Sequence, residues 1–206
     1  MLTIAVGEGA GERLAAVLAA VPIASVVVAA VAGRSLVAGD VVPLIAAGQA
    51  GGAAVLIEGD AELARSCRAD GVHIGFAEEP GEPFEAARAI VGGRAIVGAA
   101  AGRSRHTAMS LGEHGADYVA FDVPAFVKDR ETAFERQRDL IAWWSEIFEI
   151  PCVAMDVDGP DDAAELAAAG VDFVCMTIGA GVAVGDAVDW ARAFAAAIGP
   201  EARTPA

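Results

Sequence analysis

The chain is poor in cationic side chains. It has 14 lysine and arginine residues against 29 aspartate and glutamate residues, a formal net charge of −15. Nucleic-acid binding depends on lysine and arginine side chains that neutralise phosphates, so this balance argues against a nucleic-acid partner. It also argues against an anionic lipid surface, which the same charges would repel.

Cysteine is scarce as well. The three cysteines, Cys67, Cys152 and Cys175, are odd in number and lack the spacing of a metal site. This pattern favours reduced thiols packed in a core over a disulfide framework. We therefore expect a cytoplasmic protein.

One uncharged run, residues 14–33, comes near the length needed to cross a bilayer. Its upstream flank holds Glu8 and Glu12 against a single Arg13, which is the wrong sign for a secretory signal. Pro22 divides the run into a helical half and a β-branched half. We expect two elements of a globular fold there and no membrane segment.

Several nucleotide and hydrolase motifs are missing. The sequence has no Walker loop, no histidine pair at helical spacing and no Ser-His-Asp order. GEGAG at residues 7–11 approaches a dinucleotide fingerprint, but Glu12 replaces the third glycine. The string DVDGPDD, which begins at Asp156, has Ala167 where a calcium loop needs glutamate. These absences argue against hydrolase, nucleotide-hydrolysing and EF-hand sites.

The sequence is rich in hydrophobic residues, and its apolar segments recur in a regular pattern. Hydrophobic residues make up 55% of 206 residues, enough for a sheet that is covered on both faces. ADGVHI (69–74), GADYVAF (115–121) and GVDFVCM (170–176) each place an aspartate between a helical, alanine-rich run and a short apolar strand. Double glycines precede two more strands, at 51–57 and 92–98. The repeat predicts alternating helices and strands.

The pattern predicts eight strands and eight helices in one domain over residues 1–206. The strands are expected near residues 2–6, 23–29, 53–58, 71–74, 94–98, 117–121, 151–155 and 172–176. This order favours a single parallel (β/α)₈ TIM barrel over an open doubly wound sheet, which would want a dinucleotide fingerprint.

His73 stands out because it interrupts an otherwise apolar strand. Residues of a barrel strand alternate between the interior and the helix layer, so Val72 and Ile74 are expected to face the helices. His73 is then expected to point into the barrel near its carboxyl end, where ligand-binding groups collect. A packed histidine bonded to a backbone carbonyl is the alternative.

Several segments resemble the thiamine phosphate synthase/TenI family: LIEGDAELARSCRADGVHIG (56–75), IVGAAAG (96–102), GADYVAF and IPCVAMDVDGPDDAAELAAAGVDFV (150–174). ADGVHIG is the most specific of them. The resemblance runs from about residue 51 onward and implies a (β/α)₈ barrel. It also implies a transferase of thiamine biosynthesis that couples a pyrimidine pyrophosphate to a thiazole phosphate, with magnesium on the pyrophosphate. TenI-type members instead isomerise a thiazole phosphate.

Many motif positions of that family carry other residues in this chain. The substituted positions are Glu58-Gly59 for an Asn-Asp pair, Phe76-Ala77-Glu78 for Gln-Glu-Asp, Ala100 for a serine, and Asp156-Val157 for a Gly-Gly turn. Arg34 and Lys128 are displaced candidates for the family's cationic positions. These substitutions argue against the full synthase reaction, because two phosphorylated substrates would meet an acidic mouth.

The candidate site residues follow from the barrel and the resemblance. The substrate-binding candidates are His73, Asp122, Asp156, Thr177, Gly179 and Gly181, and the last three belong to a glycine-rich loop able to hold one phosphate. Glu58 and Glu78 are the candidate ligands for magnesium, on strands that flank His73. An acidic mouth favours a metal ion or an organic cation such as a thiazolium. Asp60, Asp158 and Asp161 precede helical runs and are expected to be N-caps or dipole partners.

Two functions stay open. One is an enzyme of thiamine biosynthesis or a diverged relative that acts on a small heterocyclic substrate. The other is a non-catalytic barrel that binds a thiamine-related or cationic ligand or a partner protein. We predict no specific catalytic residue for either function. Trp143 and Trp144 cannot share one helix face, so one of them is a candidate for a homo-oligomer interface, with burial as the alternative.

Overall fold

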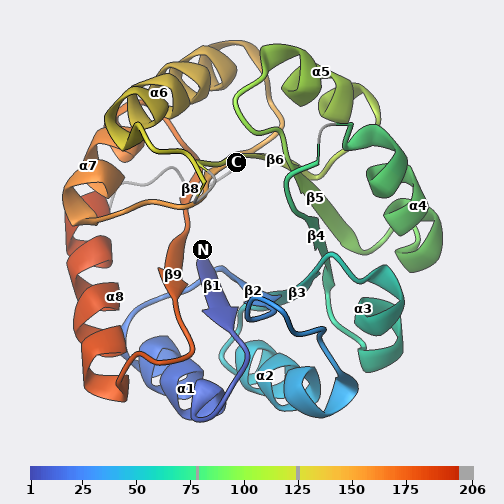
Figure 1. Cartoon of the computed structure of the whole chain (residues 1–206), viewed down its shortest axis with the longest axis vertical. Coiled ribbons are helices and arrows are strands. Elements are labelled where there is room, and N and C mark those ends of the chain that lie inside the picture. Colours follow the sequence, from blue (N-terminus) through green and yellow to red (C-terminus); the bar gives the residue numbers. More distant parts are fainter. Residues whose placement is uncertain (78, 124–125, 200–206) are drawn as a thin grey trace.

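The protein is a parallel α/β barrel with an inner ring of strands and an outer ring of helices (Figure 1). The computed structural model describes residues 1–77, 79–123 and 126–199. The strands are β1 (Leu2–Ala5), β2 (Ser25–Ala29), β3 (Ala54–Glu58), β4 (Gly71–Ile74), β5 (Ile96–Ala100), β6 (Tyr118–Phe121), β7 (Cys152–Ala154), β8 (Phe173–Val174) and β9 (Met176–Ile178). The helices are α1 (Ala10–Ala20), α2 (Ala38–Ala50), α3 (Ala61–Cys67), α4 (Gly81–Val91), α5 (Arg105–Glu113), α6 (Arg130–Ile147), α7 (Pro160–Ala168) and α8 (Val184–Ile198).

The sheet returns to its first strand. Strands β1 to β8 pair in parallel in sequence order, and β9 pairs with β1. Only Cys175 separates β8 from β9. Its amide N–H donates to the carbonyl of Ala154 on β7, at 2.8 Å, while that of Met176 donates to the carbonyl of Met1, at 3.3 Å. β8 and β9 are therefore two halves of the eighth barrel strand, and the predicted TIM barrel is confirmed.

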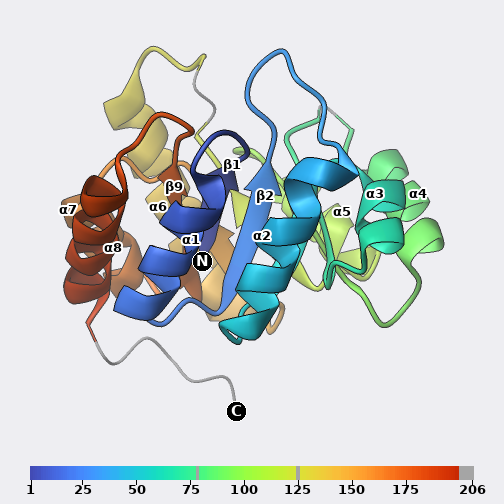
Figure 2. The same cartoon turned by 90° about the horizontal axis from the view of Figure 1, so that it is seen from below.

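The loops that follow the strands gather at one end of the barrel. In the side view of Figure 2 the strands point upward, and the β2–α2 loop and the start of α6 rise at the top. We call this carboxyl end of the strands the mouth and the opposite end the amino end.

The strands divide their side chains between two cores, as a barrel requires. One apolar cluster lies between the sheet and the helices and includes Val72 and Ile74. A second, smaller cluster fills the barrel interior; its buried members are Val27, Leu56, Tyr118, Ala120, Val153, Met155 and Cys175. His73 is 2% exposed and bonds to Tyr118 of the inner cluster. The predicted orientation of strand β4 is confirmed.

The recurring aspartate before a strand has a structural cause. The carboxylates of Asp70, Asp117 and Asp172 each accept a hydrogen bond from a backbone N–H on the preceding strand, at 2.7–2.9 Å. These N–H groups belong to Val55, Val97 and Cys152. Each carboxylate satisfies a buried donor at the amino end of a parallel pair, so the repeat seen in the sequence ties neighbouring strands together.

The long uncharged run forms two elements of the barrel. Helix α1 ends at Ala20, and β2 begins at Ser25 after Pro22. The predicted division of this run is confirmed. No helix within the described residues is long and apolar enough to cross a membrane.

Two of the three aspartates expected at helix starts lie there. Asp60 caps α3 by accepting a hydrogen bond from the N–H of Leu63, at 2.8 Å, and Asp161 lies in the first turn of α7. The cap prediction for Asp158 is wrong, because Gly159 is the N-cap residue of α7 and the Asp158 carboxylate pairs with Arg130. The guanidinium of Arg130, at the start of α6, binds that carboxylate directly.

The two adjacent tryptophans of α6 pack within the chain. Trp144 is fully buried and donates from Nε1 to the carbonyl of Ile150, at 2.7 Å. Trp143 is partly covered by Phe148 and by the Arg105 guanidinium, which lies 4.7 Å from the indole centre. The contacts of Trp143 therefore supply no argument for a homo-oligomer, which stays a prediction.

Glycine at position 98 makes the His73–Tyr118 contact possible. Strands β4, β5 and β6 bring His73, Gly98 and Tyr118 into one row. The Tyr118 ring lies directly over Gly98, so that its hydroxyl reaches His73 Nδ1 at 2.8 Å and the two rings lie parallel. A Cβ on residue 98 would overlap the tyrosine ring. The buried polar pair thus depends on the absence of a side chain between its members.

We predict that Gly98→Ala lowers the free energy of unfolding by at least about 2 kcal/mol, because the added methyl displaces Tyr118 and breaks the buried hydrogen bond. Urea unfolding measures this loss. Gly39→Ala on α2, where a Cβ meets open space, is the matched control and should not destabilise the protein. A Gly98→Ala protein as stable as the wild type would contradict the packing described.

Candidate functional site

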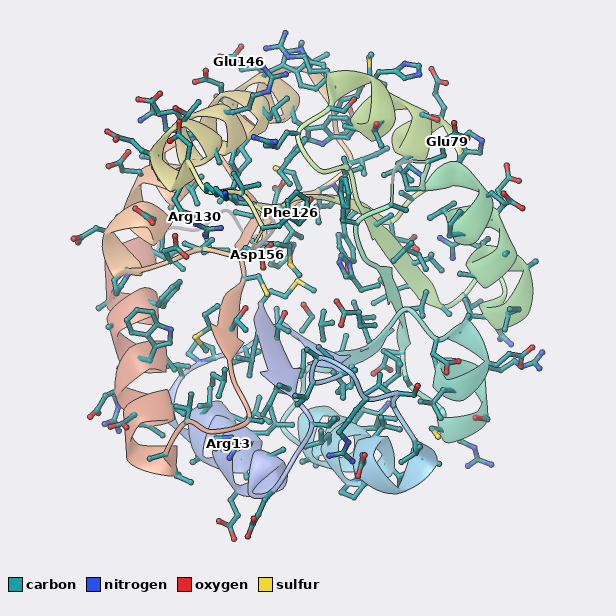
Figure 3. All side chains as sticks on the ribbon, viewed as in Figure 1. Arg13, Glu79, Phe126, Arg130, Glu146 and Asp156 are labelled. Carbon is teal, nitrogen blue, oxygen red and sulfur yellow. The ribbon has the colours of Figure 1, made fainter. Side chains whose placement is uncertain are left out.

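A pocket of about 350 Å³ lies at the mouth, among the loops that follow β6, β7 and β9. It is lined by Val123, Arg130, Asp156, Val157, Asp158 and Thr177. Two residues predicted from the sequence, Asp156 and Thr177, are thereby brought together. Figure 3, a view along the barrel, shows Asp156 near the centre of the ring and Arg130 beside it.

Arg130 is the cation among the residues that line this pocket, and it was not predicted from the sequence. Its guanidinium forms a two-pronged pair with the Asp158 carboxylate, at 3.0 and 2.7 Å. It also donates to the carbonyl oxygens of Val123, at 2.9 Å, and Asp156, at 3.3 Å. Arg130 therefore ties the loop after β6 to the loop after β7, and its charge is largely compensated within the protein.

Asp156 occupies a backbone conformation that usually favours glycine. Its φ is 57°, in the left-handed region that aspartate tolerates better than most residues. This is the first position that matches the Gly-Gly turn of the resembling family. The turn thus keeps a glycine-like backbone while it carries a carboxylate. Partial removal from water raises the pKa of that carboxyl, and Arg130 opposes the shift.

Asp122 follows β6 and is the most buried acid of the mouth. It is 6% exposed, and its Oδ1 has no hydrogen-bond partner within the described residues. Burial raises the pKa of its carboxyl to about 6, and the nearby Asp156 carboxylate adds to the shift. Backbone N–H groups and Arg103 oppose this shift only in part, so the acid favours a proton or another cation.

Two exposed aromatic rings lie beside this acid. Phe76 and Phe126 are 52% and 72% exposed and meet edge to face, with ring centres 6.3 Å apart. Gly102 has a positive φ of 59°; a Cβ on it would lie 2.9 Å from the Phe76 ring and 3.9 Å from Asp122 Oδ1. The ring of Phe76 and the carboxyl of Asp122 therefore both lie close to Gly102. Figure 3 places Phe126 near the barrel axis.

His73 and Glu58 lie side by side in the interior, one on each of two paired strands. Burial lowers the pKa of His73 to about 4, so the imidazole is neutral near pH 7. Its Nδ1 is engaged with Tyr118, which leaves only Nε2 for a ligand. Glu58 is half-buried, and burial together with Asp156 raises the pKa of its carboxyl. A ligand role for either residue stays a prediction.

The glycine-rich loop after β9 gives mixed support to a phosphate role. Thr177 is exposed and lines the mouth pocket. Gly179 and Gly181 lie in the connection to α8, outside the lining of that pocket. Gly7 approaches this connection closely, because a Cβ on it would lie 3.2 Å from that of Ala180. A phosphate contact at the two glycines stays a prediction.

The predicted magnesium ligands are Glu58 and Glu78. Within residues 1–77, 79–123 and 126–199, no group of three or more His, Cys, Asp or Glu side chains is arranged to hold a metal ion. Glu58 lies beside a histidine whose Nδ1 already has a partner. Glu78 lies outside the described residues. A magnesium role for the two glutamates stays a prediction.

Residues 32–180 match the protein family described as thiamine monophosphate synthase. The chain belongs to this family. The match takes in the strands from β3 to β9 and with them Glu58, Asp122, Asp156 and Thr177. The family resemblance predicted from the sequence is confirmed.

Individual relatives agree with this assignment. Thiamine-phosphate synthase of Erythrobacter litoralis is 41% identical over 137 residues, which cover 66% of this chain and 63% of that protein. The enzyme of that name from Hyphomonas neptunium is 41% identical over 131 residues, 64% of this chain and 58% of the relative. The chain spans about three fifths of these curated relatives. A solved thiamine phosphate pyrophosphorylase from Pyrococcus furiosus shares the fold, with a TM-score of 0.73, 20% identity and coverage of 96% and 94% of the two chains.

The raised pKa of Asp122 predicts a pH-dependent cost to stability. In the unfolded chain this carboxyl titrates near 3.8, and in the folded protein near 6. The fold therefore binds the proton more tightly, and stability is lost as pH rises through this window. We predict that Asp122→Asn stabilises the protein at pH 7.5 by about 1–3 kcal/mol and has little effect at pH 3.5.

Urea unfolding at both pH values measures the difference. Asp139→Asn, an exposed aspartate on α6, is the matched control and should change stability little at either pH. An Asp122→Asn effect that is the same at both pH values would show that burial does not shift this carboxyl.

Proposed function

We propose that this family member binds a heterocyclic cation of the thiamine class at the barrel mouth, and that it forms thiamine phosphate far more slowly than enzymes typically turn over. The observation that carries the proposal is the buried Oδ1 of Asp122, which has no hydrogen-bond partner among the described residues and is flanked by the exposed ring of Phe76. A planar cation placed between them gains both a carboxylate partner and a cation–π contact.

The electrostatics of the mouth support a cation over a phosphate. Glu58, Asp122 and Asp156 all have raised carboxyl pKa values, and Asp156 contributes to the shifts of the other two. Mutual repulsion of this kind is relieved by a positive ligand and increased by an anion. Arg130, the cation of the mouth pocket, is already bound to Asp158.

The substituted phosphate positions support a slow or lost synthase reaction. A backbone cradle for phosphate needs N–H groups free of nearby negative charge. Asp156 keeps the left-handed backbone of the family's glycine turn but adds a carboxylate to it. Arg34, a displaced candidate for the family's cations, is exposed on the β2–α2 loop and pairs with Asp40, at 3.4 Å.

A second function, the synthase reaction at an ordinary rate, is favoured by the relatives that are named thiamine-phosphate synthase. Arg130 could take part in it only by exchanging Asp158 for a substrate phosphate. The two functions differ in the ligand charge that the mouth selects, and that difference can be measured.

We predict that calorimetry detects thiamine binding at pH 7.5, and that Asp122→Asn and Phe76→Ala each weaken it by about fivefold or more, since each removes one contact worth about 1 kcal/mol. The affinity should rise between pH 5 and pH 7 as Asp122 ionises near pH 6. Glu146→Gln removes an equal charge at the outer rim of α6 (Figure 3) and is the matched control. Absence of thiamine binding, or equal binding by all variants, would refute the cation site.

We predict that a steady-state assay with pyrimidine pyrophosphate, thiazole phosphate and magnesium gives turnover well below about 1 s⁻¹. Asp156→Gly should tighten thiazole phosphate binding, because it removes a carboxylate from the turn and fits the positive φ better. Val157→Gly alone, which leaves the charge in place, is the control. Turnover of about 1 s⁻¹ or faster in the wild type would instead establish the synthase.

A further inference from the structure

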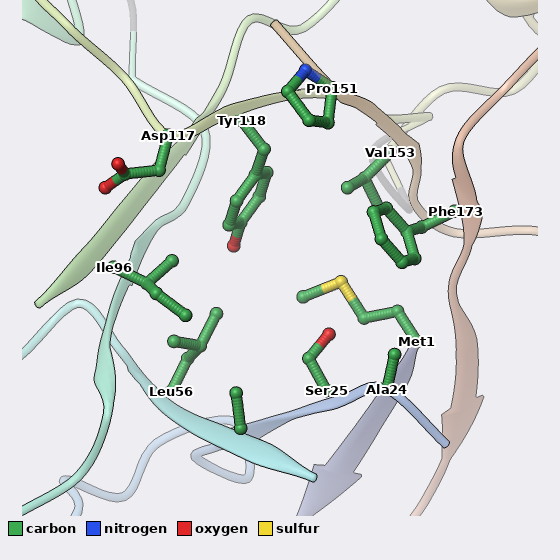
Figure 4. A pocket seen from close by; sticks show the side chains of 11 residues that line it. Met1, Ala24, Ser25, Leu56, Ile96, Asp117, Tyr118, Pro151, Val153 and Phe173 are labelled. Carbon is green, nitrogen blue, oxygen red and sulfur yellow. The ribbon is translucent and has the colours of Figure 1, made fainter. Parts of the chain in front are cut away.

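A second pocket, of about 300 Å³, enters the barrel at its amino end, opposite the mouth. Figure 4 shows the side chains of 11 residues that line it. They come from the starts of the strands: Met1, Ala24, Ser25, Ala54, Leu56, Ile96, Asp117, Tyr118, Pro151, Val153 and Phe173. The proposed function makes no use of this pocket.

The pocket exists because inward-facing side chains are small on one side of the barrel. The interior of a TIM barrel is normally filled by layers of bulky side chains. Here Ser25 faces Ala54 on the paired strand, and both side chains are small. They help to leave the space that Figure 4 shows between Leu56 and Tyr118.

The residues that line the pocket disfavour a charged ligand. Among the 11 residues the one charged side chain is Asp117, and its carboxylate is already bound by Arg88 and by the N–H of Val97, at 2.6 and 2.7 Å. The N-terminal amine of Met1 already donates to the carbonyl of Val174, at 3.0 Å, and burial lowers its pKa. Tyr118 is neutral, because burial raises the pKa of its hydroxyl well above 10. A charged ligand would lose its hydration without gaining a partner.

The pocket also contains hydroxyl groups that can hydrogen-bond to a neutral molecule. Ser25 presents a hydroxyl toward the space in Figure 4, and the Tyr118 ring and hydroxyl line the same space. An apolar cavity of about 150 Å³ is enough to hold benzene, so a pocket of this volume takes one or two rings.

From these observations we infer that the amino-end pocket is a second ligand site, specific for neutral, flat molecules of one or two rings with a single hydrogen-bonding group. The site is independent of the mouth. Its roof is the Tyr118 side chain that positions His73, so an occupant touches the polar pair at the centre of the barrel.

The sequence supplies a reporter for this site, since Tyr118 is the protein's one tyrosine. Ring-¹³C tyrosine labelling therefore gives NMR signals from the pocket alone. Phenol is the neutral probe, and benzoate and benzylammonium are charged probes of similar size. We expect phenol to shift the Tyr118 ring signals saturably, and each charged probe to bind at least about tenfold more weakly.

Ala54→Leu fills the pocket and should abolish the saturable phenol shift. Ala15→Leu adds the same atoms to the exposed face of α1 and should leave the shift unchanged. If Ala54→Leu fails to fold, Ser25→Leu fills the pocket from the paired strand. Overturning results are a wild-type shift that does not saturate, equal binding of a charged probe, or undiminished phenol binding by a folded pocket-filling variant. Thiamine binding at the mouth bears on none of these outcomes.

Discussion

The hydrogen bond between His73 and Tyr118 is the contact around which the barrel interior is arranged. It requires glycine at position 98, because the tyrosine ring occupies the place of a side chain there. Both partners are neutral, because burial lowers the pKa of His73 and raises the pKa of Tyr118. One polar pair thereby separates an acidic mouth from an uncharged amino-end pocket.

The two ends of the barrel consequently differ in chemistry although the same strands build both. At the mouth, carboxylates that follow consecutive strands repel one another, and the exposed rings of Phe76 and Phe126 give a planar cation a surface to lie on. At the amino end, Asp117 is the one aspartate that lines the pocket, and its carboxylate is bound by Arg88 and by the N–H of Val97. At the mouth, Arg130 pairs with Asp158, whereas Asp122 is buried without such an ion pair among the described residues.

The sequence predicted well wherever periodicity or a local motif decides the outcome. The order of strands and helices, the inward direction of His73 and the cap formed by Asp60 all follow from neighbours within a few residues. It predicted less well where a contact joins distant loops. Asp158 was expected to be an N-cap or a dipole partner of a helix; it is not the N-cap, and Arg130, 28 residues away, binds its carboxylate. Strand β5 lies two residues later than the double glycine suggested, because its pairing with β4 sets its start.

By itself, then, the sequence determined the parallel barrel, its family and the acidity of its mouth, since alternation, spacing and composition are properties of the chain before it folds. The tertiary structure alone decided which groups meet: Arg130 with Asp158, Tyr118 over Gly98, and Phe76 beside a buried Asp122. It also decided where space remains, because a cavity depends on the summed volumes of side chains from several strands. Burial and proximity of this kind arise only when segments far apart in the sequence pack together, and they set the charge states on which binding depends.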